Sequence, residues 1–357
     1  MPNDRPLLVT ADADVLDDLL RLAATAGVEL EVAPDATGAR RAWVSSPMVV
    51  VGPDAAERCA RARLPRRAGV VLLGNDLDDA GIWQLAVELG AEHVLFLPDA
   101  EPWLVGALAD AAEGSGSDGA VVAVLGGRGG AGATTLACAL AVSAERLGHR
   151  ALLVDGDPLG GGIDLVFGGE LQAGLRWPDL GGTRGRVPAA ALAEALPRLH
   201  DLAVLSWGRE DSPAVPAAAV KAVLAAGRRT CDLVVVDLPR ALDDAAREVL
   251  AVATTTLLVV PAEVRAAAAA SRVAAAAGLL CHDLRVVVRM PGPCGLGARE
   301  VTEALRLPLG GELRPEPGLD SALERGEPPG RRARSPLGVL CDGLLAELLP
   351  LIAGRAA

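Results

Sequence analysis

Several residue types and patterns are scarce in this sequence, and their scarcity excludes whole classes of protein. The chain has no tyrosine, two phenylalanines and a single lysine, Lys221, so arginine carries almost all the positive charge. No apolar run reaches the length of about 20 residues that a membrane-spanning helix needs. The opening residues, MPNDRPLLVT, lack the cationic and apolar regions of a secretory signal. We therefore expect a cytoplasmic protein.

Clustered metal ligands and surplus basic charge are also missing. The six cysteines are scattered without a C-x-x-C pair, and the four histidines are isolated. This pattern is typical of reduced thiols and argues against a disulfide framework or a zinc site. The net charge of −12 argues against a non-specific nucleic-acid binder, which needs excess Lys and Arg to displace counterions. We expect no specific nucleic-acid partner.

What is present, over residues 7–112, is an alternation of short apolar runs with helical spacing. Strand patterns lie at residues 7–10, 48–51, 70–73 and 93–97, and helical patterns at 15–26, 82–89 and 103–112. Such alternation predicts an α/β domain with a parallel sheet between two layers of helices. The order of these elements and the stretch GAEHVLFLP resemble a response-regulator receiver domain, which is CheY-like and flavodoxin-like.

The chemistry that this resemblance implies is incomplete. A receiver needs acidic residues after its first strand, a phosphoryl-accepting Asp at the end of its third strand, and a Lys before a proline. Asp12 and Asp14 supply acid, but Asp54 lies beyond Pro53, and Leu97 stands at the Lys position. Loss of that ammonium group removes a charge-assisted bond of about 1.5–3 kcal/mol. Residues 1–112 are therefore predicted to be a degenerate receiver-like domain that serves for docking or dimerisation.

A second α/β domain is predicted after a Gly/Ser linker at residues 113–119, EGSGSDG. Strand patterns recur at residues 121–125, 151–154, 202–205, 233–236, 256–260, 285–288 and 309–313. Helical patterns occupy residues 134–147, 189–196, 217–226, 242–251, 266–280, 299–305 and 337–352. We expect residues 120–357 to form one domain with a mainly parallel sheet.

The second domain opens on a glycine-rich loop, in residues 121–136, VVAVLGGRGGAGATTL. A strand, a glycine turn and a helix N-terminus in this order make a phosphate-binding loop, because the turn amides and the helix dipole attract anions. Gly127, Gly132 and Thr134 fit the pattern G-x-x-x-x-G-K-[ST], but Ala133 stands at the lysine position. The predicted nucleotide-binding residues are Gly127, Arg128, Gly129, Gly130, Gly132, Ala133, Thr134 and Thr135.

Three acidic residues stand at the ends of predicted strands. Asp155 and Asp157 follow the second strand of this domain in LLVDGDP, and Asp237 ends the apolar strand VVVDLP. A carboxylate beside a phosphate loop can orient an attacking water or support Mg²⁺. Each motif alone is also common turn chemistry. Together they predict Asp155 and Asp157 as catalytic residues, with Thr134 and Asp237 holding Mg²⁺, the latter through water.

These motifs are similar to those of the MinD/ParA superfamily of P-loop NTPases, over about residues 120–350. GGRGGAGATT resembles the deviant loop KGGxGKT of that superfamily, and LLVDGDP and VVVDLP resemble its acidic strands. The receiver-like front domain and the segment GGIDLVFGGELQAGLRWPDL resemble CpaE-like proteins, most closely the actinobacterial septum site-determining (Ssd) branch. The resemblance implies ATP-driven homodimers that mark cell positions.

The loop departs from the superfamily at both lysines. The first lysine, which acts across the dimer interface, is Arg128, and Arg keeps the charge. The second, which binds phosphate, is Ala133, whereas Thr134 and Thr135 remain. The adenine-contacting Asn is absent from residues 288–292, VRMPG. A general drift from Lys to Arg explains Arg128 but not Ala133, so we infer relaxed selection for phosphate catalysis.

The predicted function is a septum site-determining regulator of cell division. Loss of one charge-assisted phosphate contact weakens binding of ATP and Mg²⁺ by about 1.5–3 kcal/mol, and hydrolysis suffers more because the lysine stabilises growing charge. Two alternatives stay open: a CpaE-like localisation factor for Flp-type pilus assembly and secretion, and an active ATPase that uses Arg128. The expected partners are a second copy of the chain and division or pilus proteins.

Two further segments leave alternatives open. Leucines recur at helical spacing in residues 337–352, whose polar face carries Asp342 and Glu347 rather than basic residues. We favour a helix packed on the sheet over a peripheral contact that recruits the chain to the membrane or septum. The Gly-rich residues 156–185 contain Trp177, which is either a hot spot for a partner or part of a local core.

Overall fold

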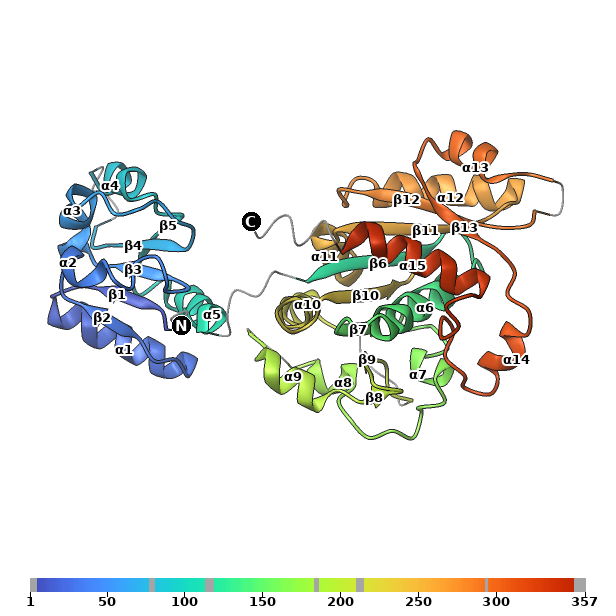
Figure 1. The fold of residues 1–357 in the computed structure, drawn as a ribbon, viewed down its shortest axis with the longest axis horizontal. Coiled ribbons are helices and arrows are strands. Elements are labelled where there is room, and N and C mark those ends of the chain that lie inside the picture. Colours follow the sequence, from blue (N-terminus) through green and yellow to red (C-terminus); the bar gives the residue numbers. More distant parts are fainter. Residues whose placement is uncertain are drawn as a thin grey trace. The chain divides into compact units, whose positions relative to one another are not determined.

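The computed structural model describes residues 5–76, 81–112, 119–182, 186–209, 215–292 and 295–349. The chain divides into two compact units, Met1–Gly116 and Ser117–Ala357, and each has its own sheet (Figure 1). Of the predicted linker, residues 113–118 lie outside the described residues, and only Gly119 is described.

The first unit is a five-stranded parallel sheet in the order β2-β1-β3-β4-β5. Its strands are β1 (Leu7–Val9), β2 (Glu31–Ala33), β3 (Val49–Val51), β4 (Val70–Gly74) and β5 (His93–Phe96). Its helices are α1 (Ala13–Ala26), α2 (Ala36–Ala39), α3 (Pro53–Arg61), α4 (Gly81–Leu89) and α5 (Glu101–Ala112).

Helices cover both faces of this sheet. Because successive strand residues point to opposite faces, Leu7 and Val9 lie in the core under α2, α3 and α4, whereas Leu8 lies in the core under α1 and α5. The sequence prediction missed β2, α2 and α3. In β2 only Ala33 is buried, and the two helices bury mostly alanines, which give a weak apolar period.

The carboxylate of Asp54 is engaged by the end of β1. It accepts hydrogen bonds from the Thr10 hydroxyl at 2.7 Å and from the Ala11 amide at 2.8 Å. Arg58 lies one turn along α3, with its guanidinium 3.6 Å from the same carboxylate. Leu97, at the receiver's lysine position, packs against the core on the α1 and α5 side. Asp54 thus fixes the loop after β1, and the loss of phosphate chemistry stays a prediction.

The second unit contains an eight-stranded sheet in the order β13-β12-β11-β6-β10-β7-β9-β8. All pairings are parallel except β8 with β9 at one edge. The strands are β6 (Ala120–Gly126), β7 (Ala151–Asp155), β8 (Arg198–Leu199), β9 (Leu202–Leu205), β10 (Leu233–Leu238), β11 (Thr255–Pro261), β12 (Leu284–Arg289) and β13 (Leu309–Leu313). The central strand β6 delivers the glycine-rich loop, as the sequence predicts.

Helices lie on both faces of this sheet as well (Figure 1). One face carries α6 (Ala133–Arg146), α7 (Ile163–Val166) and α15 (Pro336–Leu348). The other carries α8 (Trp177–Leu180), α9 (Ala189–Ala195), α10 (Ala217–Thr230), α11 (Asp244–Val252), α12 (Val264–Ala277) and α13 (Ala298–Leu305). The short helix α14 (Leu319–Leu323) precedes α15. Central strands are therefore buried on both sides, which explains their unbroken apolar runs.

The C-terminal helix α15 packs against α6 and β13. Its apolar face is buried, and its members are Leu337, Cys341, Leu344, Leu345 and Leu348. An ion pair between Arg146 and Asp342 ties α15 to α6. This arrangement agrees with the favoured prediction of a helix packed on the sheet, and Ile352 lies outside the described residues. No helix in the described ranges is long and apolar enough to span a bilayer.

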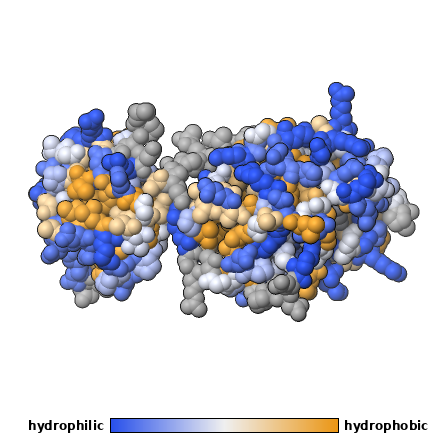
Figure 2. Space-filling view, turned by 90° about the horizontal axis from the view of Figure 1, so that it is seen from below, coloured by the Kyte–Doolittle hydropathy of each residue, from blue (hydrophilic) through white to orange (hydrophobic). Residues whose placement is uncertain are grey.

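The visible surface of each unit mixes apolar patches with charged side chains (Figure 2). In the first unit, Trp83 and Val87 of α4 are 54% and 70% exposed. Trp103 of α5 is 41% exposed, and its ring lies edge-on to that of His93, with centroids 4.7 Å apart. The predicted docking role of this unit stays a prediction.

Candidate functional site

The predicted site residues converge at the carboxyl edge of the second sheet. A cleft of 520 Å³ opens where the loop after β6 meets the end of β10. The predicted residues that line it are Arg128, Gly129, Gly130, Gly132, Ala133, Thr134, Thr135, Asp157 and Asp237. Gly127 and Asp155 lie beside the cleft without lining it. In a parallel sheet all strands end on one edge, which brings these distant residues together.

Two glycines of the loop meet strict conformational demands. Gly132 directly precedes α6 and has φ +100°, a conformation that side chains disfavour. A Cβ on Gly127 would lie 2.6 Å from the Cβ of Ala270 in α12. The glycines therefore let the loop close tightly between β6 and α12.

The loop presents free amide groups to the cleft. In the described part of the chain, no hydrogen bond from the amides of residues 129–134 to a protein acceptor is found, whereas the Gly127 amide donates to Val259 O at 2.9 Å. These amides belong to the turn and to the first residues of α6, where the helix dipole concentrates positive potential. Unsatisfied donors at a helix N-terminus form an anion-binding site.

Thr134 and Asp237 make the polar pair at the floor of the cleft. The Thr134 side chain lies close enough to the Asp237 carboxylate to lower its pKa, and Asp237 is only 4% exposed. Burial raises the pKa of Asp237 from 3.8 to about 7, with a smaller upward contribution from Asp155. A hydroxyl and a carboxylate are hard oxygen ligands of the kind that Mg²⁺ prefers. A divalent cation here would favour the charged carboxylate.

Asp237→Asn is expected to stabilise the metal-free protein at high pH. Because the folded-state pKa is raised, stability is lost as pH rises from about 4 through about 7. Above this pH range, the ionised Asp237 carboxylate lowers the free energy of unfolding by up to about 4 kcal/mol. The new amide has unsatisfied hydrogens, so we expect a net gain of about 1–2 kcal/mol at pH 8.5.

This gain should disappear at pH 4.5, where wild-type Asp237 is protonated. Denaturant unfolding in EDTA at the two pH values measures the difference. Asp157→Asn, at a partly exposed carboxylate, is the control. An equal effect of Asp237→Asn at both pH values would contradict the prediction.

Asp155, predicted as catalytic, is the centre of a buried network. One carboxylate oxygen accepts from the Asp157 amide at 3.2 Å, and the other from the Ile163 amide and the Ser206 hydroxyl, both at 3.0 Å. The residue is 2% exposed, and burial raises its pKa to about 6. Two of its described carboxylate contacts hold the segment after β7, and the third joins it to Ser206 after β9. Its catalytic role stays a prediction.

The same network contains both tryptophans of this region. The indoles of Trp177 and Trp207 donate to the carbonyl oxygen of Asp155, at 2.6 and 3.1 Å. Trp177 is 1% exposed. Of the two alternatives for Trp177, the structure therefore supports the local core.

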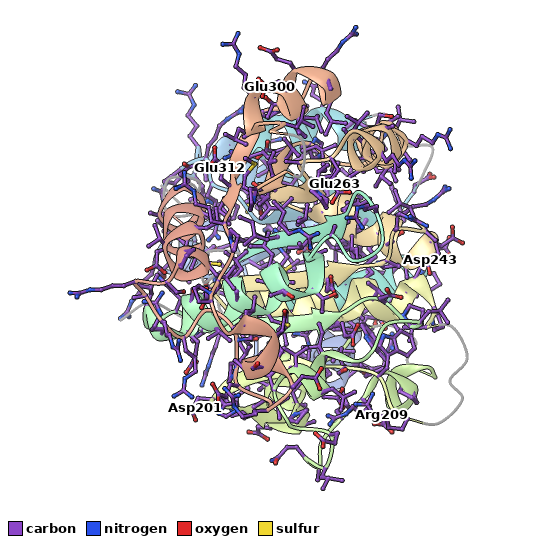
Figure 3. All side chains as sticks on the ribbon, turned by 90° about the vertical axis from the view of Figure 1, so that its right-hand side faces the viewer. Asp201, Arg209, Asp243, Glu263, Glu300 and Glu312 are labelled. Carbon is purple, nitrogen blue, oxygen red and sulfur yellow. The ribbon has the colours of Figure 1, made fainter. Side chains whose placement is uncertain are left out.

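An ion pair between a buried carboxylate and an exposed arginine extends the network. Arg209, labelled in Figure 3, contacts Asp164 at 2.9 Å, and the Asp164 side chain is only 4% exposed. Ser206, which donates to Asp155, also lies 3.4 Å from the Asp164 carboxylate. The sequence prediction missed Ser206, Arg209 and Asp164, because no motif linked them to the loop after β7.

Arg128, at the signature lysine position, is engaged within its own chain. One terminal nitrogen lies 2.9 Å from the carboxylate of Glu263, which directly precedes α12 and is labelled in Figure 3. The other donates to Gly129 O at 3.0 Å. Its side chain is 32% exposed. Both ends of this guanidinium are thus occupied.

Two arginines that sequence reasoning missed also line the cleft, Arg240 and Arg289. Arg289 is the last residue of β12, and its Nη1 donates to Gly130 O of the loop at 2.9 Å. Arg240 follows the end of β10, two residues beyond Leu238. A sequence signal existed for Arg289, which directly follows the predicted strand 285–288 as Asp237 follows 233–236, whereas Arg240 lies four residues beyond its strand.

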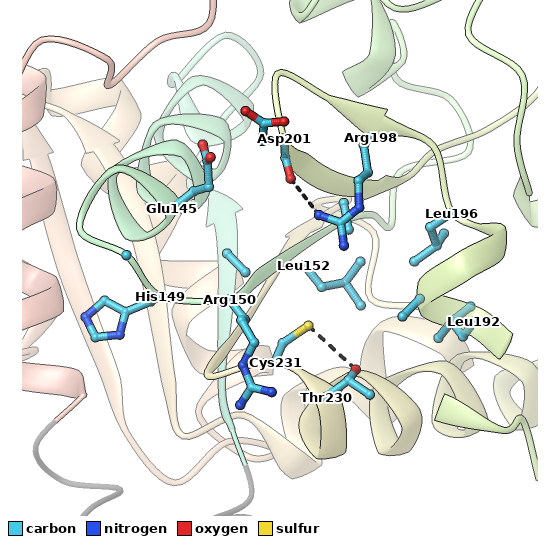
Figure 4. A pocket seen from close by; sticks show the side chains of 14 residues that line it. Glu145, His149, Arg150, Leu152, Leu192, Leu196, Arg198, Asp201, Thr230 and Cys231 are labelled. Carbon is cyan, nitrogen blue, oxygen red and sulfur yellow. Dashed lines mark hydrogen bonds between the residues drawn. The ribbon is translucent and has the colours of Figure 1, made fainter. Parts of the chain in front are cut away.

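A separate cavity of 310 Å³ lies near the amino ends of β7, β9 and β10 (Figure 4). Its apolar wall includes Leu152, Leu192 and Leu196. In its polar part, Arg198 donates to Asp201 O at 3.0 Å, and burial raises the pKa of Cys231. None of the predicted site residues lines it, because it faces the opposite edge of the sheet.

The two units match two known protein families. Residues 9–119 match the family described as Rv3660c-like, CheY-like N-terminal domain, and residues 120–294 match the family of cellulose biosynthesis protein BcsQ. The uncharacterised protein Rv3660c of Mycobacterium tuberculosis is 44% identical over 340 residues. The alignment covers 92% of this chain and 96% of that protein. The chain belongs to the Rv3660c family.

Solved structures extend the likeness of the second unit. A chain of the MinC:MinD cell division protein complex of Aquifex aeolicus is 22% identical, with a TM-score of 0.52, covering 64% of this chain and 96% of that one. MinD of Pyrococcus furiosus is 20% identical, with a TM-score of 0.52, covering 63% and 99%. At these identities the likeness shows the fold alone.

The fold prediction is confirmed at this level. The Rv3660c-family chain combines a CheY-like N-terminal domain with a domain that has the fold of MinD, and its sheets are mostly parallel. A further structure of this fold, MinD of Pyrococcus horikoshii, was solved with Mg-ADP, is 18% identical, has a TM-score of 0.51, and the match covers 67% of this chain and 98% of that one.

The groups that line the cleft are of the kinds that bind a nucleotide polyphosphate with Mg²⁺. The free amides of residues 129–134 suit phosphate oxygens, and the pair of Thr134 and Asp237 suits a hard cation. The groups that would contact the nucleotide base are less specific, because Arg289 lies in the segment where the superfamily's Asn was expected.

Proposed function

We propose that this chain is a nucleotide-responsive spatial regulator of the MinD/ParA type that acts in septum-site determination. One observation carries the proposal: the loop backbone and the pair of Thr134 and Asp237 are intact around the cleft, whereas the lysine position is Ala133. A site of this kind retains phosphate and Mg²⁺ ligands but lacks the loop lysine, whose ammonium group stabilises the charge that grows in the transition state. Binding therefore persists, and hydrolysis is slow.

In this proposal the chain's own residues perform three tasks. The amides of residues 129–134 bind phosphate oxygens, and the glycines hold those amides in position. Thr134 and Asp237 orient Mg²⁺, which when bound neutralises phosphate charge. The buried network around Asp155 keeps the loop after β7, with Asp157, at the cleft edge. Binding then favours a homodimer, which recruits partner proteins at the division site.

The biochemical test is calorimetric titration of the full chain with ATP, in Mg²⁺ and in EDTA. We expect saturable binding in Mg²⁺ that weakens by at least about tenfold in EDTA and in Thr134→Val, which removes one hydroxyl and keeps the shape. Light scattering should show a larger dimer fraction with ATP than without it. Absence of binding at millimolar ATP, or turnover of about 1 s⁻¹, would contradict the proposal.

The cellular test follows a fluorescent fusion of the full chain in the organism that encodes it. Wild-type protein should collect at division sites, and Thr134→Val should spread through the cell at equal abundance. Collection at pilus assembly sites instead would support the alternative of a CpaE-like localisation factor. If wild type and Thr134→Val had the same distribution, localisation would not depend on nucleotide binding. That result would overturn the proposal.

A further inference from the structure

We infer that Arg289, assisted by Arg240, binds the nucleotide phosphates in place of the lysine that Ala133 replaces. This inference rests on the proposed nucleotide binding and names the side chains that supply its positive charge. The ligand class is a nucleoside triphosphate or diphosphate, because the loop amides and two guanidinium groups together offer more donors than a single phosphate can accept.

The position of Arg289 is the first argument. Its Nη1 donates to Gly130 O at 2.9 Å, so the guanidinium is anchored on the loop itself. A Cβ placed on Gly132 would lie 3.9 Å from Arg289 Cδ and 4.0 Å from Nη1. Gly132 is the direct neighbour of Ala133. The guanidinium therefore lies beside the position from which a loop lysine would extend.

The remaining donors of Arg289 are the second argument. In the described residues, Arg289 makes one hydrogen bond, to a neutral carbonyl, and no ion pair. A guanidinium has five N–H donors in a rigid fork that matches phosphate oxygens in pairs. Anchoring one donor on the loop leaves the others for the ligand and reduces the entropy that binding would cost.

Arg240 supplies a second cation on the neighbouring wall. It lines the cleft, is exposed, and has no ion pair or side-chain hydrogen bond within the described ranges. It follows β10, on the side of the cleft that carries Asp237, whereas Arg289 is the last residue of β12. The two arginines thus approach the cleft from strands on opposite sides of β6. A polyphosphate that lies along the loop passes between them.

Arg128 does not fill this role in the described state. Glu263 neutralises it at 2.9 Å, and Gly129 O occupies its other terminal nitrogen. Its recruitment would first require that ion pair to break. Arg289 and Arg240 contribute charge without such a competitor.

The experiment measures binding of ATP, ADP and adenosine to the full chain with Mg²⁺, for wild type, Arg289→Gln, Arg289→Lys and Arg240→Gln. We expect Arg289→Gln to weaken ATP binding by about 10- to 100-fold, the effect of one charge-assisted bond. Arg289→Lys should weaken ATP binding less than Arg289→Gln does, and Arg240→Gln should weaken it several-fold. Adenosine binding should not change. Arg299→Gln, at a residue that is 84% exposed and paired with Glu303, is the control for net charge.

A double-mutant cycle gives the sharper readout. If Arg289 does the work of the missing lysine, Ala133→Lys should raise ATP affinity more in the Arg289→Gln background than in wild type. If Arg289 had only a structural role, Ala133→Lys would raise ATP affinity equally in both backgrounds. Thermal unfolding of every variant shows that the fold persists, and Arg289→Lys keeps the test valid should Arg289→Gln unfold.

The outcomes separate this inference from the proposed function. If wild type binds ATP and Arg289→Gln binds it equally well, the inference is wrong and the proposed function stands. Equal losses for ATP and adenosine would also overturn it, because they indicate a distorted cleft. If wild type binds no nucleotide, both the inference and the proposed function are wrong. A selective loss for ATP that Ala133→Lys repairs supports both.

Discussion

Asp155→Ala is expected to lower the free energy of unfolding by about 3 kcal/mol at neutral pH. It removes the acceptor from two buried donors, the Ile163 amide and the Ser206 hydroxyl, and from the partly buried Asp157 amide. Each unsatisfied donor costs about 1–3 kcal/mol. Relief of a buried carboxylate, whose pKa burial raises to about 6, returns about 3 kcal/mol of that total. Denaturant unfolding monitored by tryptophan fluorescence measures the net loss.

Asp157→Ala is the matched control, because Asp157 is the neighbouring carboxylate and is partly exposed. Its carboxylate accepts one hydrogen bond, from the Leu159 amide at 3.0 Å, so we expect a loss below about 1 kcal/mol. Equal stability of the two variants would contradict the role of Asp155 as a structural hub. The comparison matters for function, since lost activity in Asp155→Ala would otherwise be mistaken for lost catalysis.

Ala133→Lys is expected to strengthen ATP binding by about tenfold or more and to raise the rate of hydrolysis. The side chain of Ala133 lines the cleft at the first position of α6, so an ammonium group there reaches bound phosphates. One charge-assisted bond accounts for about 1.5–3 kcal/mol, and an added cation stabilises the transition state more than the ground state. Titration calorimetry and phosphate release measure the two effects.

Ala133→Gln controls for side-chain length without charge and should leave both quantities near wild type. Stronger binding without faster hydrolysis would show that the remaining groups, including Asp155 and Asp157, do not activate water. No gain in affinity from Ala133→Lys in folded protein, in both the wild-type and the Arg289→Gln backgrounds, would contradict the assignment of the cleft as a phosphate site. It would also remove the basis of the proposed nucleotide response.

Local motifs allowed much of the site to be predicted from the sequence. Gly132, Ala133 and Thr134 are adjacent in the chain, and their roles depend on a turn and a helix start that short-range geometry dictates. Asp237 could be placed because an apolar strand ends at it. The fold class followed from the alternation of strand and helix patterns, and the comparisons confirm it.

Side-chain partners distant in sequence could not be predicted in this way. Glu263 holds Arg128 from 135 residues away, and Arg289 donates to Gly130 from 159 residues away. The role of Asp155 as a hub depends on Ser206 and on an amide in the loop after β7. A carboxylate at a strand end gives the same sequence pattern whether its side chain faces a cleft or joins a buried network.

The sequence by itself predicted a phosphate-binding loop without its lysine, after a receiver-like domain in the chain, and it determined the α/β class of both domains. Only the tertiary structure decided which charges surround that loop. The reason is the strand order, β12-β11-β6-β10-β7, which sets the ends of strands far apart in the chain beside one another. That arrangement brings Arg289 and Arg240 to the cleft and leaves Arg128 bound to Glu263.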